Sequence, residues 1–414
     1  MFKQQSFKCL PILITVLLII TVLVSPTAGV VNNLQQSAAS SGSWNIETIV
    51  LNWEAQVPEN SMDGRAISLV MDKNNTPHLA YYDAKNGEIR YVSRVNGTWT
   101  DELVGSSAGT FSVSIAVDGA DNPSISYGDG FHFGNLMYAE KIGGSWIVTS
   151  VDRGSYGGVE DSSLGNAGHY SSLVLDDLGN PHISYNDGRN FGNLKYAVRK
   201  NGEWESEIVD RGVNGFLFGS TGYDSSLNLD TSGNPCISYR DGNYYGTLMY
   251  AEKTQDHWVI TKVDTGWDWD NETLQDSTGN TGSYTSLALD CDGNPVIAYY
   301  DMKKKSLMNA QRMWPRTEFI NWPIGIPASL SADDTGGYVS LAIDRNDHRH
   351  ISFYDATEKT LNYYMLDGSQ ILVLTVDSGN AGRYASLALD SSGQPHIAYY
   401  HAADNTLRYA SLNG

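Results

Sequence analysis

The chain has 414 residues, of which 41% are hydrophobic, 18% are charged and 41 are glycines. This composition excludes an intrinsically disordered chain and is typical of turn-rich β proteins. The formal net charge of −20 argues against nucleic acid or an anionic membrane surface as a partner and favours neutral or cationic ligands. An acidic surface that only keeps the protein soluble is the alternative interpretation.

The first 28 residues differ from the rest of the chain. Lys3 and Lys8 precede the apolar run 10–24, which is followed by small residues up to Ala28. This order predicts a signal peptide over residues 1–28, and therefore a secreted protein, extracellular or at the cell surface, with no membrane span after cleavage. An uncleaved anchor is the alternative, although 15 apolar residues are short for a membrane span. We expect residues 29–43, which are small and polar, to form a flexible linker.

From residue 44 onward the chain consists of seven copies of one unit. Each copy has an aspartate, a proline five residues later (Arg349 in the sixth copy), and a tyrosine or phenylalanine nine residues after the aspartate. The aspartates are Asp72, Asp118, Asp176, Asp230, Asp290, Asp344 and Asp390. A strand-rich unit repeated at a period of about 50 residues indicates a radial or linear array of small sheets.

Each copy divides into four expected strands, named A to D here. In the third copy they cover residues 170–175, 181–185, 194–198 and 204–209. Strands A and B are apolar on both faces, as expected for a sheet that lies between two neighbouring sheets. Four-stranded sheets packed in this way around an axis form a β-propeller.

The D strands predict how the array closes. Strand D begins with a tryptophan in copies one to five, namely Trp99, Trp146, Trp204, Trp258 and Trp314. The sixth D strand, 371–376, lacks the tryptophan, and the seventh copy has no D strand, but residues 44–50 have the same pattern. We therefore expect an all-β, seven-bladed propeller over residues 44–414, whose N-terminal strand completes the last blade. A linear solenoid, which would leave open edges, is the alternative.

Units such as SLALDSSGQPHIAYY, residues 386–400, resemble the repeats of secreted bacterial and archaeal seven-bladed β-propellers, which are broadly related to Asp-box (sialidase-type) propellers. The resemblance covers about residues 44–414 and implies the fold. The strict Asp-box pattern fits poorly, because the serine here lies four residues before the aspartate. Such propellers include lectin-like modules, adhesins, glycosidases and polysaccharide lyases, so the resemblance does not select one function.

The two faces of the predicted propeller differ. The A–B turns are short and uniform, and we expect their aspartates to accept hydrogen bonds from backbone amides within the turn. The B–C loops and D–A connections on the other face vary in length, and the longer ones belong mainly to copies two to five. Because binding usually resides in variable loops on a uniform scaffold, we predict a lopsided ligand-binding face over these blades.

This face is rich in aromatic and polar residues. Aromatic rings stack on the C–H faces of sugars while polar side chains bond to the hydroxyls; packing of the long loops is the alternative role. The predicted ligand-binding residues are Phe131, Phe133, Arg189, Phe191, Tyr244, Tyr245, Trp267, Trp269, Asp129, Asp187, Asp241 and His401. We expect a monomer that binds an extracellular glycan, with an extracellular protein ligand as the alternative.

The last four of these residues belong to a ring at the ends of the B strands. The ring consists of Asp83, Asp129, Asp187, Asp241, Asp301 and Asp355, with His401 in the seventh copy. We expect these residues to cap the loops, and the alternative is a site for sugar hydroxyls or for Ca²⁺, which prefers oxygen ligands. We otherwise expect no cofactor and assign no metal ligands.

No pair or triad of residues is singled out as catalytic. A glycoside hydrolase would need two carboxylates from the ring, and a polysaccharide lyase could use His132, His169, Arg189, Tyr223 or His401. The histidines His78, His182, His350 and His396 share one repeat position, which favours a packing role. Cys236 and Cys291 either form a disulfide or are two buried thiols.

Overall fold

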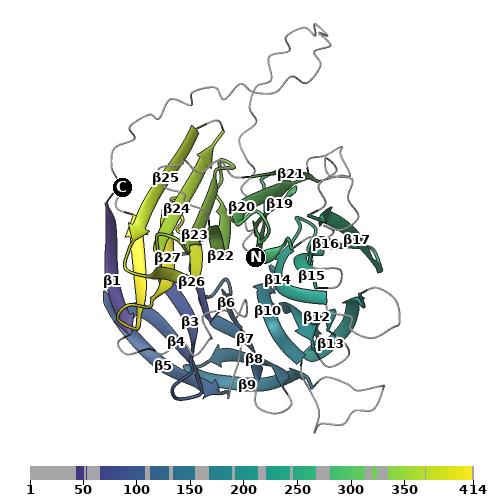
Figure 1. Cartoon of the computed structure of the whole chain (residues 1–414). Helices are drawn as coiled ribbons and strands as arrows, with labels where there is room; N and C mark the ends of the chain where they lie inside the picture. The colour runs from purple at the N-terminus through teal and green to yellow at the C-terminus, as the bar shows by residue number, and fades with distance from the viewer. Residues whose placement is uncertain are drawn as a thin grey trace, which may run out of the picture.

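The structure is a computed structural model of the chain (Figure 1). It describes residues 43–50, 53, 66–107, 112–129, 134–153, 167–188, 192–212, 221–242, 246–266, 280–312, 319–323, 334–368 and 370–412. The expected signal peptide, and the expected linker apart from its last residue, lie outside these ranges, so both stay predictions. The described residues contain strands and turns, and no helix long and apolar enough to cross a membrane is found among them.

Seven antiparallel sheets of four strands form the blades. Blade 1 has β2 (Ile67–Met71), β3 (Pro77–Asp83), β4 (Glu88–Val95) and β5 (Thr98–Ser106). Blade 2 has β6 (Val113–Val117), β7 (Pro123–Asp129), β8 (Asn135–Ile142) and β9 (Ser145–Asp152). Blade 3 has β10 (Ala167–Leu175), β11 (Pro181–Asp187), β12 (Asn193–Lys200) and β13 (Glu203–Asp210). Blade 4 has β14 (Thr221–Leu229), β15 (Pro235–Asp241), β16 (Thr247–Thr254) and β17 (His257–Asp264).

The remaining three blades follow the same order. Blade 5 has β18 (Ser283–Leu289), β19 (Pro295–Asp301), β20 (Ser306–Gln311) and β21 (Ile320–Pro323). Blade 6 has β22 (Thr335–Ile343), β23 (Arg349–Asp355), β24 (Thr360–Asp367) and β25 (Gln370–Asp377). Blade 7 has β26 (Ala381–Leu389), β27 (Pro395–His401) and β28 (Thr406–Leu412), and its fourth strand is β1 (Trp44–Val50).

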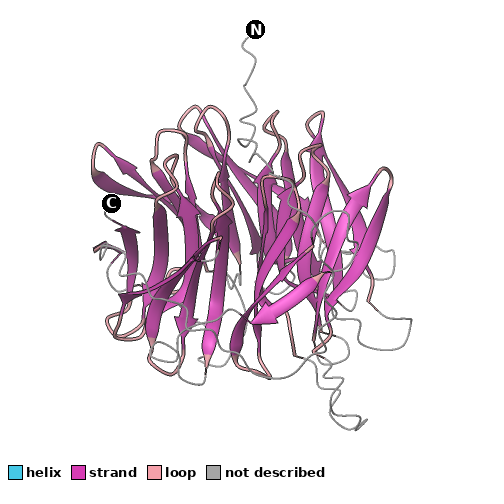
Figure 2. Cartoon of the chain, turned by 90° about the horizontal axis from the view of Figure 1, so that it is seen from above, coloured by secondary structure: helices cyan, strands magenta, loops and turns pink. Residues whose placement is uncertain are grey.

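The N-terminal strand closes the ring. β1 pairs with β28 in antiparallel orientation, with Trp44 opposite Leu412 and Glu47 opposite Tyr409. Figure 1 shows this purple strand beside the yellow C-terminal strands, and Figure 2 shows the strands running between two faces that carry the turns. The structure therefore confirms the seven-bladed propeller and its closure by the N-terminal strand, and it excludes the linear solenoid.

A ring of serine hydrogen bonds joins the inner strands. In each blade a serine Oγ accepts the backbone N–H of an inner-strand residue of the next blade, at 3.0–3.1 Å. The bond from Leu69 N–H to Ser386 Oγ links blade 1 to blade 7 and completes the circle. The seven serines are Ser68, Ser114, Ser172, Ser226, Ser286, Ser340 and Ser386. Every inner strand is thus tied to both neighbours.

Aromatic contacts and ion pairs join the blades at the outer rim. Trp146 of blade 2 packs edge-on against Tyr91 of blade 1, with ring centroids 5.2 Å apart. Lys141 lies over both rings and forms an ion pair with Glu102 of blade 1. The same tryptophan–tyrosine contact recurs at Trp99, Trp204, Trp258 and, on the closing strand, Trp44. The tryptophans that marked the D strands in the sequence therefore act as contacts between blades.

Two sequence predictions need correction. The outer strand of blade 5 is Ile320–Pro323, and Phe319 packs on Tyr250 in the place that tryptophan takes in other blades, with centroids 5.3 Å apart. The prediction that this strand begins at Trp314, which lies outside the described residues, is therefore wrong. Both alternatives for Cys236 and Cys291 are also wrong: Cys236 is a free, buried cysteine and so does not pair with Cys291, and Cys291 is only partly buried, so the two are not a pair of buried thiols.

The A–B turns confirm the predicted role of their aspartates. In all seven blades the aspartate Oδ1 accepts the backbone N–H groups two and four residues later. The repeated histidine lies beside this turn; in blade 7, for example, His396 Nδ1 is 2.6 Å from Tyr409 Oη. Burial lowers the pKa of His182, His350 and His396. These three histidines are therefore neutral at neutral pH.

Candidate functional site

The candidate site is the mouth of the central channel, at the end where the inner strands begin. In blades 3 to 7 the pairing of the two innermost strands is interrupted by a register shift at this end. At each shift one residue has a positive φ of 53–57°, and these residues are Tyr170, Asp224, Tyr284, Tyr338 and Tyr384. We call these five residues the mouth arc. Over their described residues, the corresponding strands of blades 1 and 2 pair without a shift.

The backbone of the mouth arc is strained. An L-residue in the left-handed region costs roughly 1–2 kcal/mol, and a bulky side chain there is an outlier. At this cost, a β-bulge turns a side chain in a new direction. Three of the arc tyrosines line the wall of the channel, which shows where the bulges direct them. Strain of this kind at five neighbouring blades marks the mouth as a candidate site.

The arc tyrosines of blades 5 to 7 form a continuous aromatic cluster. The ring of Tyr338 lies between the other two, with centroids 4.8 Å from Tyr284 and 4.9 Å from Tyr384. Burial raises the pKa of all three hydroxyls, so they remain neutral and can donate hydrogen bonds at neutral pH. Tyr284 and Tyr338 are only partly buried, so part of each side chain is accessible from the channel.

A second layer of tyrosines supports this cluster from the neighbouring strands. Their hydroxyls donate to carboxylate or amide oxygens: Tyr300 to Asp334 at 2.5 Å, Tyr354 to Asn380 at 2.8 Å, and Tyr400 to Asn405 at 2.5 Å. The guanidinium of Arg383 lies 5.9 Å from the ring centroid of Tyr354. The cluster is therefore held on paired strands, with the guanidinium of Arg383 beside it.

Blades 3 and 4 place a different set of side chains at the same mouth. The rings of Tyr170 and Tyr223 meet edge-on with centroids 5.3 Å apart, and the centroid of His169 is 6.4 Å from that of Tyr170. Tyr223 is paired in register with Arg240, whose Nη2 donates to Asn280 Oδ1 at 2.7 Å. Two residues named for a lyase from the sequence, His169 and Tyr223, are thereby brought to neighbouring positions.

The channel below the mouth is too small for a sugar. The cavity lined by the arc tyrosines of blades 5 to 7 and by five of the ring serines has a volume of about 70 Å³. This volume holds a few water molecules, whereas small-molecule sites measure about 300–1,000 Å³. A glycan would therefore have to lie across the mouth rather than inside the channel.

The ring at the ends of the B strands lies further from the axis, and three of its members cap the loops that follow them. Asp83, Asp301 and Asp355 accept backbone N–H bonds from the loops that follow them, as expected. His401 uses both ring nitrogens, with Nδ1 2.6 Å from Asp404 Oδ1 and Nε2 3.0 Å from Ser378 O. These contacts fix the imidazole of His401 within its blade.

The other three ring members end their strands as expected. Asp129 is half-buried, whereas Asp187 and Asp241 are buried, and Asp187 Oδ2 is 3.8 Å from the ammonium of Lys195. Lys195 also pairs with Asp152 of blade 2, so this ion cluster joins two blades. Their predicted contact with a ligand stays a prediction.

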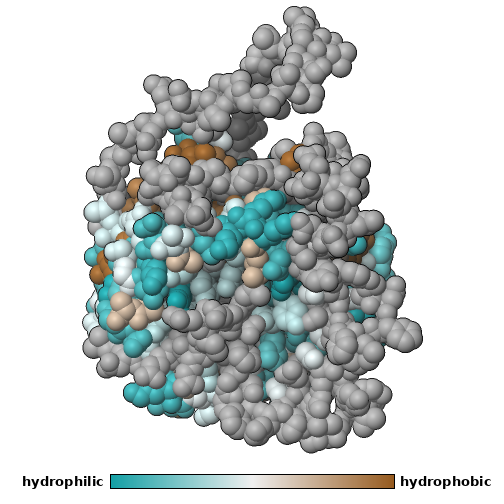
Figure 3. Space-filling view, in the orientation of Figure 1, coloured by the Kyte–Doolittle hydropathy of each residue, from teal (hydrophilic) through white to brown (hydrophobic). Residues whose placement is uncertain are grey.

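Eight predicted ligand-binding residues lie outside the described residues, and their roles stay predictions. They are Phe131, Phe133, Arg189, Phe191, Tyr244, Tyr245, Trp267 and Trp269. Sequence reasoning missed the mouth arc, although a tyrosine two residues before the ring serine in four copies was a visible signal. Figure 3 shows hydrophilic residues over much of the coloured surface, in keeping with the net charge of −20.

Comparisons with known proteins support the fold. No protein-family model matches the chain, and no curated protein sequence matches it either. The chain is similar to an ulvan lyase from a new family of polysaccharide lyases, which was solved with a bound saccharide of glucuronic acid and sulfated rhamnose. The TM-score is 0.56 at 13% identity, over 89% of this chain and 95% of the lyase. The polysaccharide lyase Uly1 has a TM-score of 0.53 at 11% identity, over 87% and 94%.

A protein of unknown function from Dyadobacter fermentans is also similar, with a TM-score of 0.53 at 9% identity, over 89% of this chain and 99% of that one. Identities this low show a shared fold and nothing about activity. The chain is therefore a seven-bladed β-propeller that has polysaccharide lyases among its structural neighbours.

Proposed function

We propose that this protein is secreted and binds a glycan across the mouth of its central channel. The observation that carries the proposal is the mouth arc, in which five consecutive blades each hold one residue at a positive φ. Three of these residues, Tyr284, Tyr338 and Tyr384, form one aromatic cluster at the channel. Tyrosines present a flat apolar ring with a hydroxyl at its edge, which suits the C–H face and the hydroxyl groups of a sugar. The small cavity below supports a ligand that lies across the mouth.

The charge of the chain favours a neutral glycan. A formal net charge of −20 repels a polyanion at long range. At physiological ionic strength this field decays over about 8 Å. A cation at the mouth could therefore offset the repulsion of an anionic glycan only where the two are in contact. Arg383 is the cation next to the tyrosines of blades 5 to 7. A neutral sugar needs no such compensation.

The test mixes the mature protein with a panel of neutral and acidic soluble polysaccharides and follows the elution of both by size-exclusion chromatography. Co-elution with an unshortened glycan supports binding. Tyr338→Ala should weaken that binding by about two- to tenfold, because an aromatic contact contributes about 0.5–1.5 kcal/mol to the binding free energy. Tyr338→Phe keeps the ring and should retain most of the affinity. Leu178→Ala, at a residue 87% exposed in an A–B turn of the opposite face, is the surface control.

A polysaccharide lyase is the second candidate, and the arrangement of His169, Tyr170, Tyr223 and Arg240 favours it over a hydrolase. A lyase removes the proton beside a uronate carboxylate, breaks the glycosidic C–O bond to the neighbouring carbon, and leaves a carbon–carbon double bond. Histidine or tyrosine can move the proton, and an arginine can neutralise the carboxylate. A glycan that elutes shorter, with new ultraviolet absorbance of an unsaturated product, would replace the binding proposal with this one. No effect with any glycan would leave a protein ligand as the partner to test.

A further inference from the structure

The A–B turn of blade 6 differs from the other six turns in its side chains. In blades 2 to 5 the second carboxylate oxygen of the turn aspartate accepts a bond from an asparagine four residues later, at 2.9–3.0 Å. In blade 6 the aspartate is Asp344 and the residue four later is His348, whose Nδ1 lies 2.9 Å from Asp344 Oδ2. This turn is on the face opposite the mouth arc.

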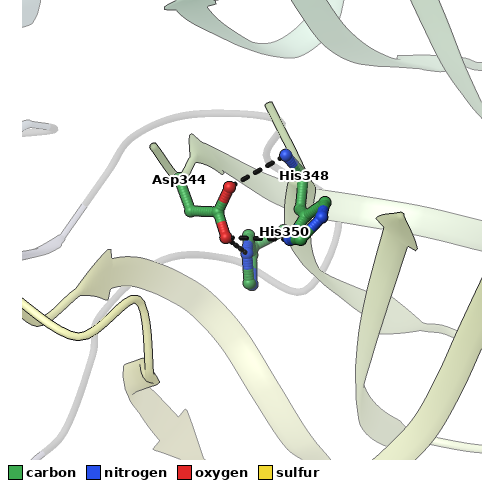
Figure 4. Close-up of side chains that lie close together, drawn as sticks. All are labelled: Asp344, His348 and His350. Atoms are coloured by element: carbon green, nitrogen blue, oxygen red, sulfur yellow. Dashed lines mark hydrogen bonds and ion pairs between the residues drawn. The ribbon is translucent and has the colours of Figure 1, made fainter. Parts of the chain in front are cut away.

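A second imidazole approaches the same carboxylate. His350 Nε2 is 3.7 Å from Asp344 Oδ2, and the side chain of His350 is only 3% exposed. Its other nitrogen, Nδ1, lies 2.6 Å from Tyr363 Oη, which fixes the direction of the ring. Among the described residues, the buried Nε2 has no hydrogen-bond partner. Figure 4 shows both imidazoles directed at the carboxylate of Asp344.

The combination of two imidazoles is particular to this turn. His182 and His396 occupy the position of His350 in blades 3 and 7, and their Nε2 atoms lie 3.6 and 3.5 Å from the turn aspartates. The residue four after the aspartate is Asn180 in blade 3 and Gln394 in blade 7, so those turns offer one imidazole each. Blade 6 is the place among the described residues where three such groups gather with all ligand atoms within 4.8 Å of one another.

A further carboxylate lies at the edge of this group. Asp367, the last residue of β24, has its Oδ1 3.0 Å from His348 Nε2. Arg349, the residue between the two histidines, donates from Nη2 to Gln311 of blade 5. The local charge of the group therefore favours a cation.

We propose that Asp344, His348 and His350 bind a divalent transition-metal ion, with Zn²⁺ as the best match. One carboxylate oxygen and two imidazole nitrogens are typical Zn²⁺ ligands, whereas Ca²⁺ takes six to eight oxygens. Bonds of about 2.0–2.2 Å in a tetrahedron separate the ligand atoms by about 3.4 Å. The observed separations of 2.9 and 3.7 Å differ from that value by only a few tenths of an ångström.

The surroundings of His350 match those of a metal ligand. A ligating histidine usually donates its other ring N–H to an oxygen, which holds the tautomer that leaves the metal-binding nitrogen free. Tyr363 Oη is in the position to accept that bond from His350 Nδ1. The metal would join the end of β22 to the start of β23, and Asp367 could extend the link to β24.

The test measures zinc binding to the mature protein without an affinity tag, after dialysis against a chelator and then against ZnCl₂. We expect one bound zinc per chain by mass spectrometry of the metal and a higher Tm with zinc than without. His348→Asn recreates the side-chain set of blade 3 and should keep the zinc-free Tm while reducing zinc affinity at least about a hundredfold, since even outer-shell changes cost about 10–100-fold. Tyr363→Phe should reduce zinc affinity by about 10–100-fold.

His182→Gln is the matched control, because it removes a buried histidine from the same repeat position in a blade with one imidazole. This variant should bind zinc like the wild type. The proposal is overturned if the wild type binds no zinc at micromolar concentrations. It is also overturned if His348→Asn retains the stoichiometry and affinity of the wild type, or if His182→Gln loses zinc to the same extent.

Discussion

The ring of inner serines predicts a position-dependent cost of serine-to-alanine substitution. Ser226 Oγ accepts the N–H of Leu287 at 3.1 Å, and Ser286 Oγ accepts the N–H of Leu341 at 3.0 Å. Both serines are buried, but Ser286 lines the channel cavity of about 70 Å³ and Ser226 does not. A water molecule can therefore replace the lost hydroxyl in one variant and not in the other.

The expected magnitudes follow from this difference. Ser226→Ala leaves a buried N–H without an acceptor, which costs about 1–3 kcal/mol. Ser286→Ala should cost less than about 1 kcal/mol, since a bridging water is nearly as good as a direct hydrogen bond. For a domain of about 370 residues the entropy of unfolding is about 0.8 kcal/mol/K, so a loss of 2 kcal/mol lowers the Tm by about 2.5 °C.

Differential scanning calorimetry of the two variants beside the wild type measures this effect. We expect Ser226→Ala to lower the Tm by about 1–4 °C and Ser286→Ala by about 1 °C or less. Equal losses in both variants would refute rescue by water. A larger decrease in Tm for Ser286→Ala than for Ser226→Ala would refute the argument that a serine beside the cavity is the less costly one to replace.

Three further predictions concern buried groups. Burial lowers the pKa of His182 and His396 below the ordinary 6.5, so the unfolded chain binds protons that the native state does not, and stability should fall as pH drops below about 6.5. Measuring the Tm at about pH 7.5 and about pH 5.5 checks this prediction. A Tm that rises at the lower pH contradicts it. Tyr299→Phe removes the donor that reaches Asp264 Oδ2 of blade 4 at 2.6 Å and should lower stability by about 1–3 kcal/mol in calorimetry, whereas an unchanged Tm would show that the bond adds nothing. Burial raises the pKa of the Cys236 thiol to about 11, so a thiol reagent near neutral pH should label it only after unfolding; rapid labelling of the native protein would contradict its burial.

Much of the architecture could be predicted from the sequence. The spacing of Asp390, Pro395 and Tyr399 recurs in every copy except the sixth, which has Arg349 and Phe353, and short apolar runs between turn residues at fixed places are enough to define strands and hairpins. The strand at Trp44 could be assigned to the last blade because the seventh copy lacks a D strand and residues 44–50, which have the D-strand pattern, precede the first copy. The fourth strand of blade 5 was misplaced because Phe319, rather than a tryptophan, packs on Tyr250.

The candidate sites required the tertiary structure. The positive φ of Tyr338 and its partners is decided by the bulges between paired strands, and no local propensity of tyrosine favours that conformation. His348 and His350 are close in sequence, but only the turn around Asp344 and the contact of His350 with Tyr363 bring their nitrogens to one carboxylate. Sequence alone determined the repeated unit and its number, because these depend on local pattern. The convergence of the arc tyrosines from different blades was decided by the closure of the ring, and that of the Asp344 group by strand pairing within blade 6; both set distances that residue spacing does not contain.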